Sequence, residues 1–467
     1  MPSGPPTPAT GTGGTTGART PGPDPHSAGP DPRTPGPDPH SAGPDPRTPG
    51  PDPHSAGPAA PGRRLARAAL AFAFWTTMAG TTVPTPLYPL YQHALGFTPL
   101  TVTVIFAVYA AGVVAGLVAL GRLSDEIGRR PVLALGLLLA AGAAGLFEAA
   151  DSLPWLLAAR VLSGLAAALV TGAATAALLD LAPPERRLRA QTVALAANMG
   201  GLAGGTLLAG LLAEWAGSPL RLPWTVMLVL TGVALVGLLA VPETVTAPVG
   251  FRPRLQPLRV PAAVRPAFRR AAVAGGSGFA VLGVLTAVSG LFLATVLGLH
   301  DHALAGLVVC LAFAATAVGQ LLARSLPKAR ALPAACAGLV LAAALVATAL
   351  LTSSLTPLLL GAGVNGLATG TAVATGLGTV NGGVPPERRG EAVSAFFAVL
   401  YTMLSVPVVG VGLLIRATDL RTAGVVFSAV VALLALAVAA GLLRSGGTAA
   451  PGHREDAARA PQGRVRG

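Results

Sequence analysis

A short polar segment between two apolar runs holds the residues whose types and spacing suggest chemistry most clearly. It is segment 121–131, which reads GRLSDEIGRRP. Asp125 is a carboxylate at the end of an apolar run, where it can meet the positive N-terminal end of another helix. Gly128 permits a tight turn at a backbone φ that a side chain disfavours. Arg129 then needs an anion, and Asp180 is the best candidate. The alternative is a solvated turn whose charges only set topology.

Arg160 is the second chemical candidate, because it lies about two helical turns inside an apolar run. In lipid, a cation at that depth costs about 2.5 kcal/mol or more unless it faces the interior of a helix bundle. Arg160 could bind an anionic substrate or take part in proton coupling. It could instead extend toward the nearer surface, or pair with Asp151 or Glu148 near the end of the run.

Long apolar runs have to position these residues. Only 11% of the 467 residues are charged and 52% are hydrophobic, whereas a soluble chain carries about a quarter charged residues. Each run has about 20 residues or more, enough to cross about 30 Å of hydrocarbon as a helix. The sequence therefore predicts an all-α membrane protein. The twelve predicted helices lie near residues 66–91, 99–121, 131–150, 154–181, 190–214, 223–241, 271–299, 303–325, 331–351, 355–380, 391–415 and 422–444.

The basic residues predict the orientation of these helices. Arg63, Arg64 and Arg67 flank the start of the first run, and seventeen further Arg and Lys residues fall in the alternate loops on the same side. The loops on the other side hold three, Arg221, Arg416 and Arg421. Because cytoplasmic loops are enriched in Arg and Lys, we expect a multi-pass protein of the cell (plasma) membrane with both termini cytoplasmic. This distribution also accounts for the net charge of +13 without nucleic acid as a partner.

The chain divides into five predicted parts. The tail repeats the unit TPGPDPHSAGPDPR from Thr20 and Thr34 and begins a third copy at Thr48. Its frequent prolines prevent regular helix or sheet, and its periodic histidines lack a fixed geometry, so we predict no metal site. The parts are 1–64, a disordered Pro-rich repeat tail; 65–243, an N-terminal six-helix half; 244–270, a cytoplasmic linker; 271–444, a C-terminal six-helix half; and 445–467, a disordered cytoplasmic tail.

The two predicted halves resemble each other at an offset of 202 residues. Residues 163–166 (SGLA) align with 365–368 (NGLA), and 183–187 (PPERR) align with 385–389 (PPERR) without a gap. Because six predicted helices separate the two copies, both halves have the same orientation in the membrane. Parallel repeats of this kind form transporters with a substrate site at the midplane between them.

Segment 121–131 resembles the signature loop of the major facilitator superfamily, G-x-L-[SA]-D-x-x-G-R-[KR], and the resemblance covers residues 65–444. It implies the major facilitator fold, with 12 transmembrane helices in two six-helix halves related by parallel pseudo-twofold symmetry. In that family the Asp contacts the start of helix 11, here near Gly390 and Glu391, and the contact latches the outward-facing state. The corresponding loop of the second half, 319–328, lacks the Asp. The resemblance implies a conformational latch formed by Gly121, Asp125, Gly128, Arg129, Arg130 and Asp180.

Two further segments are similar to family motifs. Arg160 with Ser163 and Gly164 resembles the R-x-x-x-G motif of helix 4 in proton-coupled members. Residues 198–205, NMGGLAGG, resemble the Gly-rich helix-5 motif of drug–proton antiporters, but position 205 is Gly where that motif has Pro. The alternative reading of this segment is close packing of helix 5 through Gly200 and Gly204.

Other polar residues on the predicted helices are weaker candidates for a transport path. Tyr88 and Tyr91 follow several prolines in the first run, so they could shape a cavity mouth or a gate, or anchor the helix at the membrane interface. No Asp, Glu or His lies in the middle third of any predicted helix, although proton-coupled carriers usually need one there. The candidates for substrate binding or coupling are Arg160, Asn198, Tyr88, Asn365 and Tyr401.

These residues favour a secondary active transporter that moves a small organic compound by alternating access. The helix-5 motif favours efflux, with protons as the candidate coupling ion. An uptake carrier for a sugar or metabolite and a non-transporting membrane sensor are the alternatives. A membrane-embedded enzyme would need clustered acids, histidines or metal ligands at one membrane face, and the chain offers none, so we predict no enzyme, no cofactor and no metal. The expected partners are a small-molecule substrate and the lipid bilayer, and we expect a monomer.

Overall fold

The computed structural model describes residues 61–245, 258–385 and 388–446, and within these ranges the chain is helical and contains no strand. All of these residues belong to one compact unit, 59–467, which is described here by itself. The Pro-rich repeat and the C-terminal tail beyond Gly446 lie outside the described residues. So does most of the predicted linker.

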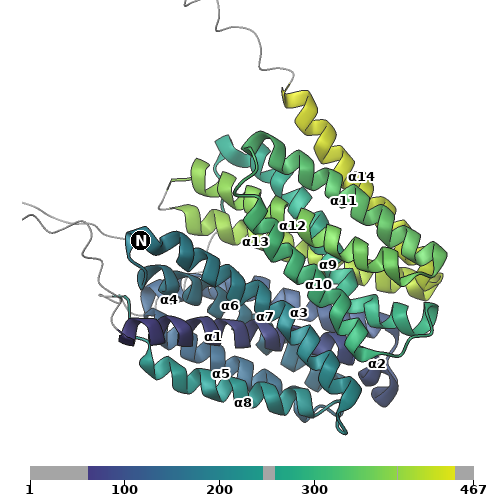
Figure 1. Cartoon of the computed structure of the whole chain (residues 1–467), viewed down its shortest axis with the longest axis horizontal. Helices are drawn as coiled ribbons and strands as arrows, with labels where there is room; N and C mark the ends of the chain where they lie inside the picture. The colour runs from purple at the N-terminus through teal and green to yellow at the C-terminus, as the bar shows by residue number, and fades with distance from the viewer. Residues whose placement is uncertain (1–60, 246–257, 386–387, 447–467) are drawn as a thin grey trace, which may run out of the picture. The chain divides into compact units, whose positions relative to one another are not determined.

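Six membrane-crossing segments form each half of the bundle (Figure 1). The first half contains α1 Pro61–Thr82, α2 Pro84–Leu95, α3 Pro99–Leu120, α4 Leu123–Glu126, α5 Arg129–Glu148, α6 Leu153–Asp180, η1 Pro184–Arg186, α7 Arg187–Trp215, α8 Leu222–Gly237 and η2 Leu238–Ala240. The second half contains η3 Ala262–Val264, α9 Arg265–Val296, α10 His302–Leu322, α11 Lys328–Thr352, α12 Leu355–Gly383, α13 Arg389–Ala417 and α14 Leu420–Gly446.

Every apolar run that the sequence marks as a helix is helical, but several boundaries differ. The first run is divided into α1 and α2 at Val83, where prolines 84, 86 and 89 remove backbone N–H donors. Among the described helices, eleven are long and apolar enough to cross a membrane alone, and α1 and α2 together supply the twelfth crossing. Helix α9 begins at Arg265 rather than near residue 271, so the end of the predicted linker is helical. Likewise, α1 begins at Pro61 and α14 ends at Gly446.

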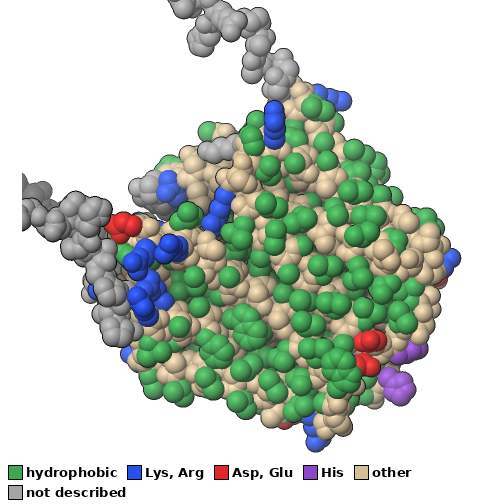
Figure 2. Space-filling model, in the orientation of Figure 1, with side chains coloured by type: hydrophobic (Ala, Val, Ile, Leu, Met, Phe, Trp, Pro, Cys, Tyr) green, Lys and Arg blue, Asp and Glu red, His purple; other side chains and the backbone are tan. Residues whose placement is uncertain are grey.

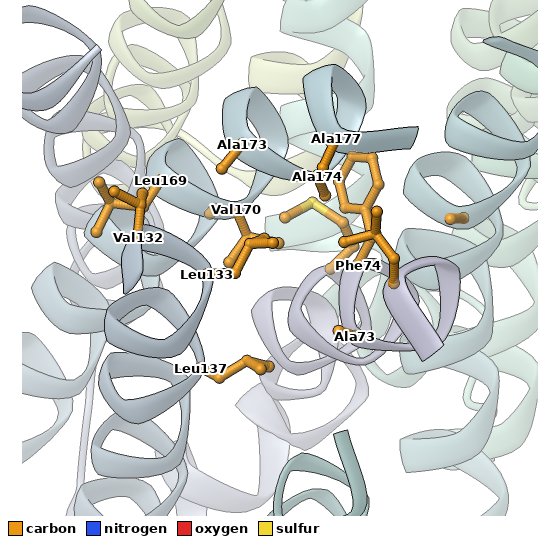
Figure 3. Packing of buried hydrophobic residues seen from close by; sticks show 14 of the residues in the cluster. Ala73, Phe74, Val132, Leu133, Leu137, Leu169, Val170, Ala173, Ala174 and Ala177 are labelled. Atoms are coloured by element: carbon orange, nitrogen blue, oxygen red, sulfur yellow. The ribbon is translucent and has the colours of Figure 1, made fainter. Parts of the chain in front are cut away.

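Helices of the first half are held together by an apolar core of small and branched side chains. Phe74 of α1 lies among Leu133 of α5 and Val170 and Ala174 of α6, all of them buried (Figure 3). The alanines on α6 let its neighbours approach closely, which is how helices pack where lipid provides no hydrophobic driving force between them. Helix α6 therefore packs closely against α1, α3 and α5.

The internal repeat appears as the same helix contact in both halves. A Cβ added at Gly164 of α6 would lie 2.5 Å from the carbonyl oxygen of Tyr109 on α3. A Cβ added at its counterpart, Gly366 of α12, would lie even closer to the carbonyl oxygen of Ala312 on α10. In each half, a glycine on the fourth membrane crossing brings that helix against the second one. The aligned SGLA and NGLA segments thus form the same close helix–helix contact in each half.

The two halves meet along two helix pairs, α3 with α13 and α7 with α10. We call the end of the bundle that carries loops 121–128, 181–186 and 323–327 the basic end, and the other end, with loops 216–221 and 297–301, the opposite end. Figure 2 shows hydrophobic side chains across the middle of one face, Lys and Arg side chains gathered at one edge, and His side chains at the other. An apolar belt between two polar ends is what a bilayer requires.

Candidate functional site

A cavity of about 1070 Å³, its opening included, lies between the two halves. It extends from the middle of the helices toward the basic end, where Leu117 of α3 and Gln320 of α10 line it within a turn of their helix ends. Aromatic rings and small polar groups both face it. They are Phe106, Tyr109, Phe279, Phe313, Phe397 and Tyr401, with Thr81, Thr82, Thr171, Asn198, Thr286, Thr316 and Gln320.

Three aromatic rings join the halves across this cavity. Tyr401 of α13 meets Tyr109 of α3 edge to face, with ring centroids 6.4 Å apart, and meets Phe279 of α9 in the same way at 6.1 Å. Edge-to-face contacts of this kind contribute about 0.5–1.5 kcal/mol beyond the burial of the rings. Of the residues predicted from the sequence, Tyr401 and Asn198 do line the cavity.

Arg160 is buried beside the cavity rather than in it. Its side chain is 1% exposed, and its Nη1 donates to the carbonyl oxygen of Thr81 at 2.8 Å, while Nη2 donates to the hydroxyl of Tyr88. Its guanidinium carbon lies 5.5–5.6 Å from the ring centroids of Tyr88, Tyr109 and Phe147, where cation–π attraction stabilises the charge.

No carboxylate among the described residues forms an ion pair with Arg160, so the alternative of a pairing with Asp151 or Glu148 is not realised in this structure. Glu148 instead accepts a hydrogen bond from Thr225 at 3.0 Å. Extension of Arg160 to the membrane surface is also excluded, because its head group is enclosed by aromatic rings. The bundle interior holds a positive charge that aromatic faces and two oxygen atoms stabilise.

The two tyrosines of α2 are not interfacial anchors. Both side chains are 3% exposed. The Tyr88 hydroxyl accepts from Arg160, and the Tyr91 hydroxyl accepts from Trp224 Nε1 at 2.9 Å and donates to the carbonyl oxygen of Phe147 at 3.4 Å. The broken first crossing turns these hydroxyls inward, which the linear sequence could not show.

Asn365 packs between helices and is absent from the cavity wall. It is fully buried, and its Nδ2 donates to the carbonyl oxygen of Gly278 on α9 at 3.4 Å. Asn365 therefore ties α12 to α9 in the second half, and its predicted place among the residues that line a transport path needs correction.

At the basic end, segment 121–131 forms a compact charge cluster. Arg129 Nη1 contacts the Asp125 carboxylate and donates to Ser124 Oγ at 2.7 Å, and Arg129 Nε lies 3.5 Å from Asp180 Oδ2. The sequence predicts this Asp180 partner. Asp125 is 66% exposed, so most of its carboxylate surface is available to another element. Gly121 has ordinary helical backbone, with φ of −60°.

Glu243 completes this cluster and was missed by the sequence reasoning. Its carboxylate sits on the N-terminus of α5 and accepts the backbone N–H groups of Arg129 and Arg130, each at 2.9 Å. It also accepts the N–H groups of Thr244 at 2.9 Å and Val245 at 3.0 Å. The only signal in the sequence is an acidic residue two positions after the end of the sixth apolar run. An anion at a helix N-terminus is stabilised by free N–H donors and the helix dipole.

Electrostatics of the Glu243 carboxyl group follow from these contacts. Partial burial raises its pKa, but the four backbone N–H donors outweigh burial and hold the pKa below the ordinary value of 4.5. The contact therefore stabilises the fold above about pH 4.5, and this contribution is lost as the pH falls through the lowered pKa. Gly128 has φ of 108°, as its place in a tight turn predicts, and a Cβ there would lie 2.6 Å from Glu243 Oε2. Glycine is thus required both by the backbone and by the carboxylate.

At the opposite end, the halves are joined by a polar contact between α7 and α10. Glu214 Oε2 accepts the backbone N–H of His302 at 2.8 Å and lies 3.2 Å from its ring Nδ1. A Cβ at the nearby Gly210 would lie 2.6 Å from the His302 carbonyl oxygen, and Gly412 of α13 faces the Thr103 side chain of α3 as closely. These contacts between the two halves close the cavity at the opposite end.

Glu214→Gln should weaken closure of the opposite end. The amide keeps an acceptor but loses the negative charge that faces the N-terminus of α10 at His302, and an anion at a helix N-terminus contributes up to about 1 kcal/mol at an exposed site. We expect the ratio of closed to open molecules to fall by up to about five-fold. Reaction of a cysteine placed at Leu404, on the cavity wall, with a membrane-impermeant maleimide added at this end reports the change. His300→Gln, in the adjacent loop, is the control, and equal labelling in both variants would contradict the role of Glu214.

Of the two glycines predicted to pack helix 5 on a neighbour, Gly204 lies close to Trp75 of α1 and Gly200 makes only ordinary contact, while the backbone of α1 comes closest to Gly201 and Gly205. A Cβ at Gly200 would make only ordinary contact, 3.8 Å from the Trp75 ring, and one at Gly204 would meet the same movable ring at 2.7 Å. In contrast, Gly201 and Gly205 face the backbone of α1: a Cβ at Gly201 would lie 2.5 Å from the Trp75 carbonyl oxygen, and one at Gly205 would overlap the Ala79 carbonyl oxygen. These two glycines make the α1–α7 contact.

Comparison with known proteins agrees with this architecture. A family model described as Major Facilitator Superfamily matches residues 70–406. Putative multidrug resistance proteins MdtD from Klebsiella pneumoniae (strain 342) and Enterobacter sp. (strain 638) are each 29% identical over 148 residues, 32% of this chain and 31% of the relative. The match thus spans about a third of these curated relatives' length.

Solved structures share the fold at low sequence identity. A bacterial homologue of the human lysosomal transporter Spinster, in an inward-facing and unoccupied conformation, has a TM-score of 0.64 and 19% identity, over 83% of this chain and 99% of that one. The human organic anion transporter MFSD10 (TETRAN) has a TM-score of 0.57 and 18% identity, over 81% and 100%. With the signature loop, the twelve crossings and the family match over most of its length, the chain belongs to the Major Facilitator Superfamily of membrane transporters.

Proposed function

We propose that this transporter exports small organic compounds across the plasma membrane by alternating access, with its basic end in the cytoplasm. The observation that carries the proposal is the cavity between the halves, which lies toward the basic end and is closed at the opposite end by Glu214, His302 and the Thr103–Gly412 contact. A cavity closed at one end of a two-half bundle is one of the two states that alternating access requires.

The direction of transport rests on two supports. The positive residues concentrate in loops of one end, which favours that end as cytoplasmic. The helix-5 segment resembles that of drug–proton antiporters, and the curated relatives carry the name multidrug resistance protein. Proton coupling would have to use groups at helix ends, such as Glu214 with His302, because no acid among the described residues lines the cavity.

Reconstituted protein tests the proposal directly. Proteoliposomes loaded with a panel of labelled organic compounds should release at least one of them faster than protein-free liposomes loaded in the same way. An imposed pH gradient should change the rate of release if transport is coupled to protons. Absence of flux for every compound from folded protein would favour the sensor alternative. Flux of sugars or metabolites inward would favour an uptake carrier, and flux that ignores the gradient would remove proton coupling.

Asp125→Asn tests the proposed latch. In this state Asp125 is largely exposed, and we propose that it contacts the N-terminus of α13, near Gly390, when the basic end closes. An anion at a helix N-terminus contributes about 0.3–2 kcal/mol, so loss of the charge should lower flux roughly two- to thirty-fold by shifting the equilibrium between states. Membrane insertion, measured by yield and monodispersity, should not change. Asp151→Asn, at the opposite end, is the control, and wild-type flux in Asp125→Asn would reject the latch.

A further inference from the structure

The wall of the central cavity carries no Asp, Glu, His, Lys or Arg side chain among the described residues. Its polar groups are neutral hydroxyls and amides, including Asn198 of α7 and Thr316 and Gln320 of α10. The rest of the wall is aromatic or aliphatic. An ion that entered this cavity would leave water without meeting a group of opposite charge, and such desolvation costs several kcal/mol.

The one charged side chain that is buried among the described residues, Arg160, is positive and lies behind the wall. Arg160 is held by the carbonyl of Thr81 and lies over the ring of Tyr109, and both of these residues line the cavity. The field of Arg160 therefore opposes a cation in the cavity. It does not provide a direct partner for an anion either, because its side chain is 1% exposed.

Aromatic rings could in principle favour an organic cation. A cation–π contact contributes about 0.5–2 kcal/mol, which is less than the desolvation cost of an unpaired ammonium group. The ring of Tyr109 is already occupied by Arg160. For an uncharged ring compound the same wall offers edge and face contacts without any desolvated charge.

We infer that the cavity selects uncharged aromatic compounds that carry a few hydrogen-bonding groups, and that it discriminates against organic cations. The inference rests on the proposed transport function and adds the substrate class. The rings of Tyr401, Phe279 and Phe397 would hold the apolar body, and the amides of Asn198 and Gln320 would meet the polar groups.

Three naphthalene compounds of nearly equal size test this selection: 2-naphthalenemethanol, 2-naphthoate and 2-naphthylmethylammonium. Binding to purified full-length protein at pH 7 is measured by the ligand-dependent rise in unfolding temperature, since a ligand stabilises the state that it binds. We expect the alcohol to bind at least ten-fold more tightly than the ammonium compound, and more tightly than the carboxylate. Equal or tighter binding of the ammonium compound would overturn the inference, as would no binding of the alcohol at millimolar concentration. Preference for the carboxylate would show that Arg160 is reached by anions, and would also overturn it.

Asn198→Asp tests the same inference by a gain of function. The substitution adds one charge to the cavity wall at nearly constant volume, so the ammonium compound should gain at least ten-fold in affinity while the alcohol loses affinity. Asn198→Ser is the uncharged control, and Gln320→Glu supplies a second carboxylate on another helix if Asn198→Asp folds poorly. No gain in either acidic variant would reject the cavity as the binding site. Failure of the transport proposal is distinguishable, because it would abolish flux in proteoliposomes and leave the order of binding unchanged.

Discussion

Gly205→Ala should destabilise the protein by about 1–3 kcal/mol, the usual cost of overpacking a close contact. The added methyl group would overlap the carbonyl oxygen of Ala79, which is backbone and cannot rotate away. Thr82 Oγ1, which donates to the Leu202 carbonyl oxygen at 2.9 Å, would also be displaced. The measurement is the unfolding temperature of the purified protein, together with the yield of monodisperse material. Gly201→Ala should behave in the same way, because it meets the carbonyl oxygen of Trp75.

Gly200→Ala is the matched control, since it lies on the same helix and differs only in the face that it presents. Its methyl group would find ordinary contact distances, and alanine is favoured over glycine in a helix by up to about 1 kcal/mol. We expect unchanged or raised stability. If Gly200→Ala destabilised the protein as much as Gly205→Ala, the assigned face of α7 against α1 would be wrong.

Arg160→Met should abolish flux without unfolding the protein, which is the second large effect that we expect. A buried charge that no carboxylate neutralises is a cost to stability, and an apolar side chain of similar length removes that cost. The hydroxyl of Tyr88 and the carbonyl of Thr81 lose a donor, which offsets part of the gain. Because a charged residue inside a membrane-spanning bundle usually marks a substrate or ion pathway, we expect the charge of Arg160 to serve transport. Flux in proteoliposomes and the unfolding temperature are measured on the same preparation.

Arg160→Lys separates the charge from the geometry of the guanidinium group. Lysine keeps the charge but cannot donate from two positions of a planar fork or stack on several rings at once. We expect flux to fall at least ten-fold. Normal flux in Arg160→Met would show that the residue is structural, and severe unfolding of that variant with normal flux in Arg160→Lys would lead to the same conclusion.

The elements of this fold could be predicted because each depends on a local property of the chain. Twelve apolar runs of sufficient length become twelve crossings, and the prolines at 84, 86 and 89 coincide with the break between α1 and α2. The depth of Arg160 in its run predicted a cation inside the bundle. Its ring of aromatic neighbours could not be predicted, because Tyr88, Tyr109 and Phe147 come from three other helices.

What the sequence could not provide is the rotation of a helix and the partner of a charge. The segment 200–205 contains glycines at 200, 201, 204 and 205. Spacing alone therefore does not decide whether Gly200 and Gly204, or Gly201 and Gly205, face α1. Glu243 and Arg129 are 114 residues apart, and Glu214 and His302 are 88 apart. Contacts at such separations arise from the arrangement of helices in the bundle, and no local pattern marks them in advance.

The broken first crossing has a consequence for how the chain enters the membrane. Alone among the crossings, it falls short of the length and apolarity that the eleven others reach within the described residues. Four threonines of α1, at positions 76, 77, 81 and 82, become buried only once α6, α7 and α8 surround them. During synthesis, a first segment that inserts weakly into the membrane is therefore followed by a strongly apolar second one, α3. Biogenesis should depend on α3 to retain its predecessor in the bilayer, and the N-terminal half should mature as a unit rather than one helix at a time.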